Sequence, residues 1–436
     1  MKPLILLFIS ALCCATWNAH AQKIIIDKNK AERKEWFQDM GFGMFIHWTV
    51  DVQLGGDISH SLAASSREYQ DRYFNELHRT FNPKEFDPDE WALLAKMAGM
   101  RYMVFTAKHH NGFCMWNTAT TDYNIMNTPF ARDALAEIVA AFRRQGLAIG
   151  LYFSPDDFHM MYRQNLPISR VTPESESSRN SELWELNRRQ LQELLRNYGK
   201  IDILFIDDNA DWVNPLVANY AWDLDPDLLI TRGGLPTPEQ RLPDKPIDGP
   251  WEACITMGSH WGYVGGERHK DAGTLINMLI ESRATGGNLL LNVGPTSHGK
   301  IAPEQEDRLR EIGLWYRANR EALEDIRPWH VSREGDVWLT GSKDGSVAYA
   351  FVSAPNWRWT EGRSFFIRSV GGSGKTRVSV LGQDDRVMEY RLDLSPRALH
   401  AVHEEGLFVH VIKAQRMSFN WNNPLVVRIE GITPKK

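Results

Sequence analysis

The chain has 436 residues, of which 43% are hydrophobic and 11% aromatic, and its formal net charge is −5. This length and composition predict two or three domains with a large buried core. No long run of Lys or Arg occurs, which argues against binding to nucleic acid or to an anionic membrane surface, since both require a clustered basic face.

The first 21 residues have the pattern of a secretory signal peptide. Lys2 gives a positive start, Leu4–Cys14 an apolar stretch, and Ala19-His20-Ala21 a small-residue cleavage site. We therefore expect an exported protein, periplasmic or extracellular. A lipid anchor is not expected, because Ser10-Ala11-Leu12 does not match the usual lipobox order. No later segment reaches about 18 uninterrupted apolar residues, so no membrane span is predicted.

Cleavage at this site would remove two of the four cysteines, Cys13 and Cys14. The remaining pair, Cys114 and Cys254, does not make a disulfide framework, and a domain of this size does not need one. Whether the two cysteines bond to each other is left open by the sequence.

Short apolar strands alternate with amphipathic helices between residues 22 and 329. Helical patterns cover Asp89–Ala98, Asp133–Gln145 and Ser181–Tyr198. The predicted strands are Gly43–Trp48, Arg101–Thr106, Ala148–Ser154, Asp202–Asp207, Leu228–Thr231, Trp251–Thr256 and Asn288–Val293. Several are continuous apolar runs, typical of parallel strands covered on both faces. The alternation predicts an α/β fold, and seven strands over about 300 residues favour a (β/α)8-like barrel over an open sheet.

Residues 330–436 have a different pattern, of short strands separated by Gly, Asn, Asp and Pro. We expect a C-terminal antiparallel β-sandwich there. Its predicted strands are Asp336–Thr340, Ser346–Val352, Ser364–Ile367, Arg377–Leu381, Leu407–Ile412 and Leu425–Ile429.

Polar side chains stand at the ends of several barrel strands. His47 ends the first strand, His109 and His110 follow the second, and Asp207 and Asp208 end the fourth. Active sites of such barrels lie at the C-terminal ends of the strands. A lone His at a strand end is more often structural, but several such ends on one face favour an active site.

Three motifs in this region carry a specific resemblance. They are Phe42–Trp48 (FGMFIHW), Thr106–Phe113 (TAKHHNGF) and Gly287–Pro295 (GNLLLNVGP). Together with Trp251-Glu252 and Ser259–Tyr263, they resemble the α-L-fucosidase family, glycoside hydrolase family 29. The resemblance runs from about Trp36 to about Trp329. It implies a barrel followed by a β-sandwich, and hydrolysis of terminal α-L-fucosides in fucosylated oligosaccharides or glycoconjugates without a metal or cofactor.

The resemblance also implies a retaining double displacement by two carboxyl groups. Asp207 occupies the position of the family's nucleophile, although capping of the following helix is an alternative for Asp207 or Asp208. Glu239, on the segment after the next strand, is the expected acid/base. Glu252 is its rival, although its strand setting suggests a structural or sugar-binding role.

Further residues match family positions that bind the sugar. The resemblance assigns sugar hydroxyls to His47, His109 and His110, and it places Tyr152 near the nucleophile and Arg232 near the acid/base segment. It also places Trp261 against the methyl group on C5 of fucose, where an apolar wall would disfavour a hydroxymethyl group.

Two departures from the family pattern affect this site. The family's His-His-Asp-Gly-Phe is here His109-His110-Asn111-Gly112-Phe113, which we expect to remove a negative charge from the pocket rim. The family's Glu-Trp clamp is not cleanly present, and Glu68-Tyr69 is the nearest candidate, which makes Glu68 a predicted substrate ligand.

Other functions stay open on the sequence alone. An α-L-galactosidase and a carbohydrate-binding homologue without catalysis are alternatives. A zinc hydrolase is disfavoured, because adjacent His109 and His110 would point to opposite sides of a strand. The linkage cleaved, the aglycone and the oligomeric state are not given by the sequence.

Overall fold

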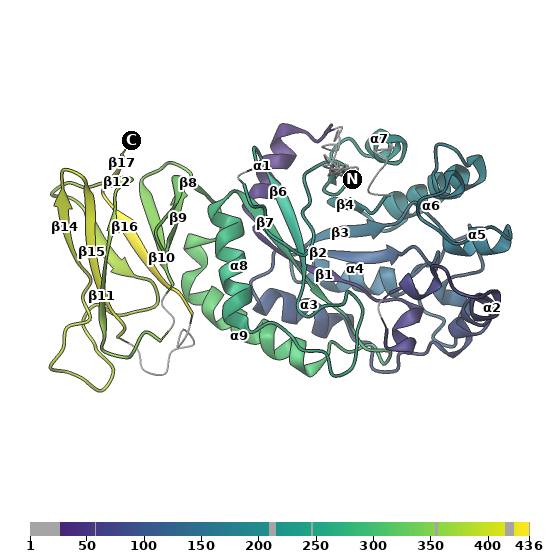
Figure 1. Cartoon of the computed structure of the whole chain (residues 1–436), viewed down its shortest axis with the longest axis horizontal. Helices are drawn as coiled ribbons and strands as arrows, with labels where there is room; N and C mark the ends of the chain where they lie inside the picture. The colour runs from purple at the N-terminus through teal and green to yellow at the C-terminus, as the bar shows by residue number, and fades with distance from the viewer. Residues whose placement is uncertain are drawn as a thin grey trace, which may run out of the picture.

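The computed structural model describes residues 27–56, 58–208, 215–245, 247–353, 356–414 and 423–435. The predicted signal segment, residues 1–21, lies outside this range, so export stays a prediction. Within the described ranges, no helix is long and apolar enough to cross a membrane. An α/β part runs from α1 (Ala31–Met40) to α9 (Pro303–Asn319), and a part made of β-sheets follows it (Figure 1).

The α/β part is built on one sheet of parallel strands in the order β5-β4-β3-β2-β1-β7-β6. The strands are β1 (Phe42–Ile46), β2 (Tyr102–Lys108), β3 (Ala148–Phe153), β4 (Ile203–Ile206), β5 (Leu229–Ile230), β6 (Trp251–Thr256) and β7 (Gly287–Val293). Each lies within two residues of its predicted limits. The parallel barrel-like fold is therefore confirmed.

The sheet is covered on both faces because successive side chains enter different cores. On β1, Met44 and Ile46 join the outer core beneath the helices, whereas Phe45 joins a smaller inner core. Gly43 lies on the same face of the strand as Phe45, and a Cβ atom there would come within 2.4 Å of the Tyr102 ring. The missing side chain leaves room for this tyrosine inside the barrel.

Among the described residues, the sheet has seven strands. An irregular segment takes the place of an eighth strand. Residues 236–240 run beside β6: the Glu252 N–H donates to Pro236 O at 3.1 Å and the Cys254 N–H donates to Pro238 O at 3.1 Å. Pro236 and Pro238 have no N–H to donate to a ladder on their other side, so this segment cannot pair as a regular central strand.

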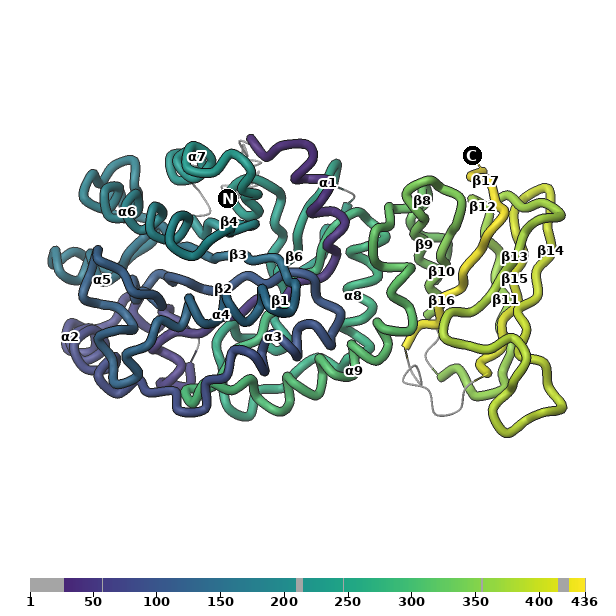
Figure 2. The backbone as a smooth tube through the Cα atoms, turned by 180° about the vertical axis from the view of Figure 1, so that it is seen from behind, coloured from purple at the N-terminus to yellow at the C-terminus, as the bar shows by residue number. Residues whose placement is uncertain are grey.

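Helices alternate with these strands along the chain and pack around the sheet, as seen from behind in Figure 2. The predicted helices are present as α3 (Pro88–Met97), α4 (Ala134–Arg144) and α6 (Ser181–Asn197). Each begins after an Asp or Asn whose side chain accepts a backbone N–H of the first turn, a strong helix-start signal. The other helices are α1 (Ala31–Met40), α2 (Arg67–Asn75), α5 (Phe158–Arg163), α7 (Pro215–Leu224), α8 (Ala272–Ala284) and α9 (Pro303–Asn319).

The C-terminal part contains antiparallel sheets in the orders β13-β16-β10-β9-β8, β11-β15-β14 and β12-β17. Their strands are β8 (Ile326–Glu334), β9 (Val337–Ser342), β10 (Val347–Val352), β11 (Gly362–Ile367), β12 (Val370–Gly371), β13 (Arg377–Val380), β14 (Leu399–His403), β15 (Gly406–Ile412), β16 (Leu425–Glu430) and β17 (Thr433–Pro434). β14 escaped sequence prediction because every one of its side chains is exposed, which removes the alternation of apolar and polar residues. The predicted limits of the domains stay predictions.

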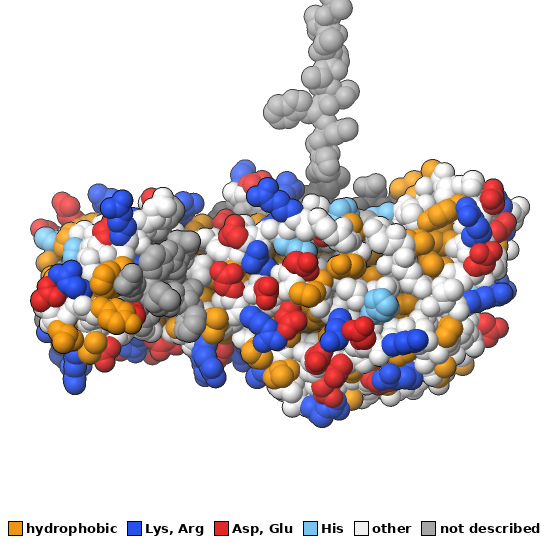
Figure 3. Space-filling view, turned by 90° about the horizontal axis from the view of Figure 1, so that it is seen from below, with side chains coloured by type: hydrophobic (Ala, Val, Ile, Leu, Met, Phe, Trp, Pro, Cys, Tyr) orange, Lys and Arg blue, Asp and Glu red, His pale blue; other side chains and the backbone are white. Residues whose placement is uncertain are grey.

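Helices α8 and α9 lie between the two parts (Figures 1 and 2). The indole N–H of Trp315 on α9 donates to Pro424 O, just before β16, at 2.9 Å. On the face in Figure 3, Lys and Arg side chains are interspersed with Asp and Glu and form no continuous basic patch.

Candidate active site

A pocket of about 390 Å³, including its open mouth, lies at the C-terminal ends of the parallel strands. Its walls combine aromatic side chains with histidines, two guanidinium groups and two carboxylates. The lining residues are Phe45, His47, Ile58, His60, His109, His110, Tyr152, Arg170, Phe205, Asp207, Arg232, Glu239, Cys254 and Trp261.

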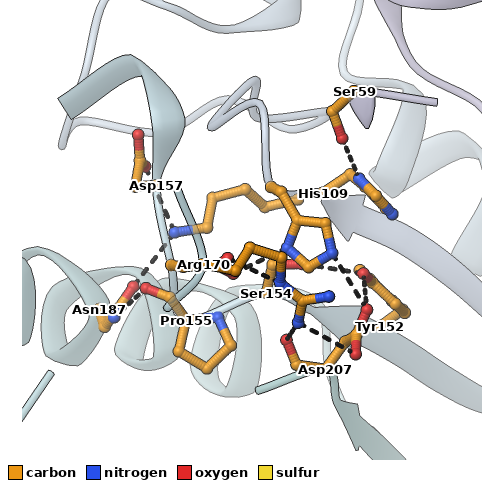
Figure 4. A network of polar contacts seen from close by, with 12 residues as sticks. Ser59, His109, Tyr152, Ser154, Pro155, Asp157, Arg170, Asn187 and Asp207 are labelled. Carbon is orange, nitrogen blue, oxygen red and sulfur yellow. Dashed lines mark hydrogen bonds and ion pairs between the residues drawn. The ribbon is translucent and has the colours of Figure 1, made fainter. Parts of the chain in front are cut away.

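Asp207 lies directly after β4, and both of its carboxylate oxygens accept from several donors. Tyr152 donates its hydroxyl to Oδ2 at 2.6 Å, and His110 Nε2 lies 3.2 Å from the same oxygen. Arg232 Nη1 donates to Oδ1 at 2.9 Å, and Arg170 Nη2 lies 3.5 Å from it. Figure 4 shows Arg170 and Tyr152 beside this carboxylate.

These donors determine the charge of Asp207. Burial alone would raise the pKa of the carboxyl, but Arg232, His110 and Arg170 outweigh it and hold the pKa well below its ordinary value of 3.8. Asp207 is therefore ionised at neutral pH, as a nucleophile must be. Asp208, the adjacent carboxylate, is not among the residues that line the pocket.

His109 and His110 both face the pocket, which corrects the expectation that they point apart. Their ring centroids are 4.3 Å from each other, because both residues follow the last residue of β2, Lys108, and so escape strand alternation. Burial and the neighbouring His110 hold the pKa of His109 well below 6.5, so His109 is neutral. Its ring stacks on Tyr152 with an interplanar angle of 4°, and Ser59 bonds its Nδ1.

His109, His110 and Asp207 offer ligand atoms within 4.8 Å of one another, so a metal site has to be considered. The donor set does not fit a cation. His110 faces a carboxylate at each ring nitrogen, at 2.7 Å from Asp156 and 3.2 Å from Asp207, which favours protons on both nitrogens. Asp207 Oδ1 also faces two guanidinium groups, those of Arg232 and Arg170, which would repel a metal ion.

His47 and Trp261 form another wall of the pocket. His47 Nδ1 lies 2.6 Å from Asn292 Oδ1 on β7, which fixes its ring. The ring centroids of His47 and Trp261 are 4.8 Å from each other, and Phe45 packs against both rings. Ile58, from the loop after β1, adds an aliphatic side chain to the lining. The pocket therefore has an apolar wall next to a hydrogen-bonding group.

Arg232 and Glu239 come from the segment that joins β5 to β6. The guanidinium of Arg232 donates to Asp207 through Nη1 and to Glu239 through Nη2. One guanidinium thus bonds to both carboxylates. The Glu239 side chain is 40% exposed, whereas that of Asp207 is 12% exposed, so the two groups differ in access to solvent.

Glu252, the rival acid/base, does not line the pocket. It points into the inner core of the barrel, where its Oε2 accepts the hydroxyl of Tyr102 at 2.5 Å. Burial raises the pKa of this carboxyl to about 7. Glu252 therefore lies in the inner core and not among the residues that line the pocket.

The structure places two predicted rim residues away from the pocket lining. Glu68 is exposed in the first turn of α2 and does not line the pocket, and the loop before that helix contributes His60 and Ile58 instead. Asn111 is fully buried rather than on the rim. Its Nδ2 lies 3.2 Å from Asp51 Oδ2, so an Asp at this position would place two carboxylates face to face.

Two residues near Asp207 were not found by sequence reasoning. Arg170 comes from the irregular stretch between α5 and α6, where no pattern marks it. Asp156 lies three residues after the end of β3 and contacts both His110 and Arg170. The rule that polar residues follow barrel strands would have found Asp156, but not Arg170.

The sequence leaves open whether Cys114 and Cys254 bond to each other, and in the structure both are free. Cys254 on β6 contributes to the pocket floor, and Cys114 is buried elsewhere. Burial raises the pKa of each thiol above its ordinary value of 9.0. Neither thiol is therefore a nucleophile at neutral pH.

Comparisons with known proteins agree with this geometry. The model of the α-L-fucosidase family matches residues 10–321. The plasma α-L-fucosidase of Rattus norvegicus is 28% identical over 395 residues, which cover 80% of this chain and 82% of that protein. The structure of α-L-fucosidase isoenzyme 1 from Paenibacillus thiaminolyticus has a TM-score of 0.73 at 29% identity, covering 93% of this chain and 99% of that one.

A third structure, of a family 29 α-L-fucosidase from Bacteroides thetaiotaomicron, is a trapped covalent intermediate in complex with 2-fluoro-fucosyl fluoride. It has a TM-score of 0.70 at 21% identity and covers 93% of this chain and 97% of that one, which shows a shared fold. The family model alone covers well over half of the sequence. This chain belongs to the α-L-fucosidase family, glycoside hydrolase family 29.

Proposed function

We propose that the protein is a retaining α-L-fucosidase that removes terminal fucose from oligosaccharides or glycoconjugates. The observation that carries this function is the ionised, buried Asp207 beside a second, more exposed carboxylate on the same guanidinium. Retaining glycosidases place their two carboxyl groups only about 5–5.5 Å from each other, and a shared guanidinium favours such closeness. The small pocket suits an enzyme that acts on a terminal sugar.

In the first step, a carboxylate oxygen of Asp207 attacks C1 of the fucose. The bond from C1 to the leaving oxygen breaks, and that oxygen takes a proton from the carboxyl group of Glu239. The product is a glycosyl ester on Asp207, formed with inversion at C1. The covalent intermediate trapped in the Bacteroides relative supports this step.

In the second step, water attacks C1 of the ester. Glu239, now a carboxylate, takes the proton of the water, and the bond from C1 to Asp207 breaks to restore its carboxylate. The second inversion gives net retention. Tyr152, Arg232 and His110 donate to Asp207 in the free site and stabilise the carboxylate that departs.

The remaining pocket residues bind the sugar. His47 and the neutral His109 are placed to exchange hydrogen bonds with its hydroxyls, and Trp261 with Ile58 forms the apolar wall. A methyl group on C5 can pack against such a wall, whereas the hydroxymethyl group of galactose would bury a hydroxyl without a partner. We therefore expect fucosides to be preferred over L-galactosides.

The test is hydrolysis of an aryl α-L-fucoside by the purified protein, followed by proton NMR of the sugar first released. We expect the α-anomer to be formed first and to equilibrate later with the β-anomer. Asp207→Ala serves as the inactive control. Initial release of the β-anomer would contradict the retaining mechanism. Faster hydrolysis of the matching L-galactoside would reassign the substrate, and sugar binding without any turnover would favour a binding protein.

We propose also that the enzyme acts after export, in the periplasm or outside the cell. The support is the N-terminal pattern of Lys2, an apolar stretch and Ala19-His20-Ala21. Mass spectrometry of the protein from its native host should find a mature N-terminus at Gln22. An uncleaved N-terminus in the cytoplasmic fraction would contradict export.

A further inference from the structure

Asp207 belongs to a closed ring of four charged side chains. His110 Nδ1 lies 2.7 Å from Asp156 Oδ1, and His110 Nε2 lies 3.2 Å from Asp207 Oδ2. On the other side, Arg170 Nε donates to Asp156 Oδ2 at 3.0 Å, and its Nη2 donates to Asp207 O at 3.2 Å and lies 3.5 Å from Asp207 Oδ1. The two oxygens of Asp156 therefore pair with different cations, His110 and Arg170, and each of these cations also contacts Asp207.

The backbone holds Asp156 in this place. The Phe158 N–H donates to His110 O at 2.8 Å, and the Ser154 N–H donates to Lys108 O at 3.0 Å, so the loop after β3 is tied to the segment after β2. The amide of Asn187 on α6 donates to Pro155 O at 2.6 Å (Figure 4). Asp156 itself is 3% exposed, and burial of its carboxylate is tolerated because both oxygens are paired.

We propose that Asp156 and Arg170 are positioning residues for the nucleophile. Asp156 orients His110 and Arg170 so that each presents a donor to Asp207. This inference rests on the proposed function, in which Asp207 forms the glycosyl ester. Neither residue needs to touch the sugar to have this effect.

The ring also keeps a counter-ion beside His110 and Arg170 during the reaction. When Asp207 becomes an ester it loses its negative charge, and without Asp156 the protonated His110 and Arg170 would face a neutral group with no counter-ion between them. Asp156 supplies that counter-ion through both steps. His110 and Arg170 then remain in place to receive the carboxylate when the ester is hydrolysed.

The two positioning residues act on His110 in opposite directions. Burial alone would lower the pKa of His110, Asp156 and Asp207 raise it, Arg170 lowers it, and the net shift is upward from 6.5. His109 faces the same ring of charges as a neutral imidazole. Arg232 contacts the same ring of charges through Asp207. Removing the charge of Asp156 should therefore make His110 lose its proton at lower pH, and removing Arg170 should do the reverse.

The experiment measures inactivation by 2-fluoro-fucosyl fluoride, because departure of fluoride needs little help from a general acid and isolates attack by Asp207. Asp156→Asn and Arg170→Gln are compared with the wild type across pH. Asp157→Asn and Arg163→Gln are matched controls: Asp157 is equally buried but contacts Lys108 and caps α5, and Arg163 is exposed on that helix. Circular dichroism checks the fold of each variant.

We expect inactivation to slow about 10- to 100-fold in both ring variants, since displacement of a reacting group by about 1 Å has effects of this size. The controls should stay within about threefold. The alkaline limb of the rate profile should move to lower pH in Asp156→Asn and to higher pH in Arg170→Gln, a signature that general loosening of the fold would not give.

Inactivation rates within about twofold of the wild type in both ring variants would overturn the inference while leaving the proposed function intact. The same holds if the alkaline limbs of the two rate profiles move in the same direction or do not move. Should Asp156→Asn fail to fold, Arg170→Gln decides the matter, because Arg170 lies on a loop and is 30% exposed. If the wild-type enzyme is neither labelled nor active, the proposed function itself is contradicted, and this inference with it.

Discussion

On one side of the pocket, the ends of β2, β3 and β4 hold Asp207 among buried partners, whereas on the other side the segment after β5 presents Glu239 to solvent. Asp207 accepts from Tyr152, His110 and Arg232, each of which is itself fixed by packing. Among the described residues, Glu239 forms an ion pair with Arg232, and it lies on the irregular segment 236–240, which contains two prolines.

The difference matches the demands of the two catalytic tasks. A nucleophile must be ionised and aimed at one atom, which a rigid, cross-paired setting provides. A group that gives a proton to the leaving oxygen and later takes one from water must reach different partners at the pocket mouth, which requires solvent access. Variants on each side of the pocket therefore test whether that side performs the task that its structure suits.

The largest effect is expected from Asp207→Gly, which removes the nucleophile. We expect kcat on an aryl α-L-fucoside to fall by more than about a thousandfold. Azide should restore part of the rate, because it can enter the vacated space and attack C1, and the product should then be a fucosyl azide with inverted configuration. Undiminished turnover in the variant would assign the attack to another group.

A smaller and substrate-dependent effect is expected on the exposed side. Glu239→Ala should lose about 100-fold or more on substrates with poor leaving groups, since general acid catalysis contributes on this scale. With a good leaving group, such as dinitrophenolate, the first step should be nearly normal. A plot of log kcat/KM against the leaving-group pKa measures this, and a slope equal to that of the wild type would sink the assignment.

Glu252→Gln distinguishes the structural carboxyl from the catalytic one. Burial raises the pKa of Glu252 from 4.5 to about 7, so the folded state favours the protonated form, and stability should fall as pH rises from about 4.5 to 7. Gln keeps the bond from Tyr102 and cannot ionise. At pH 8 we expect the variant to be more stable by up to about 3 kcal/mol, because each pKa unit corresponds to about 1.4 kcal/mol.

Denaturant unfolding at about pH 4.5 and pH 8 measures this difference, which should vanish at the lower pH. Activity of Glu252→Gln should show no dependence on the leaving group beyond that of the wild type. If this variant, and not Glu239→Ala, fails only on poor leaving groups, the proton donor has been assigned to the wrong side of the pocket.

The smallest effect is expected from thiol reagents. Cys254 is part of the pocket floor, but it is 1% exposed and burial raises the pKa of its thiol, so little thiolate is available to react. Incubation of the native enzyme with iodoacetamide at pH 7.5 should leave activity unchanged. Rapid inactivation that substrate prevents would show that the floor opens more than this structure indicates.

Much of the fold was predictable because it depends on local patterns. Continuous apolar runs identified the parallel strands, and the strand-end rule brought His47, His109, His110 and Asp207 together. The same rule does not reach Arg170, whose position depends on how an irregular loop packs against the barrel. β14 has no buried side chain and so leaves no alternation in the sequence.

Two other residues show a similar limit of sequence reasoning. Glu68 was chosen for its residue type. The direction of its helix, which follows a long loop, depends on packing against residues that are distant in the sequence. Glu252 could not be separated from a pocket residue by sequence, because neighbouring positions on β6 face either the inner or the outer core. The position of Asp207 was predictable, because a residue directly after a buried parallel strand is held at the end of that strand.

The most direct measurement is to label the enzyme with 2-fluoro-fucosyl fluoride, digest it, and locate the modified peptide by mass spectrometry. The account predicts one fucosyl ester, carried by Asp207 at the end of β4, formed in step with the loss of activity. A label on Asp208, on Glu239 or on any other residue, or full inactivation without a covalent label, would contradict it.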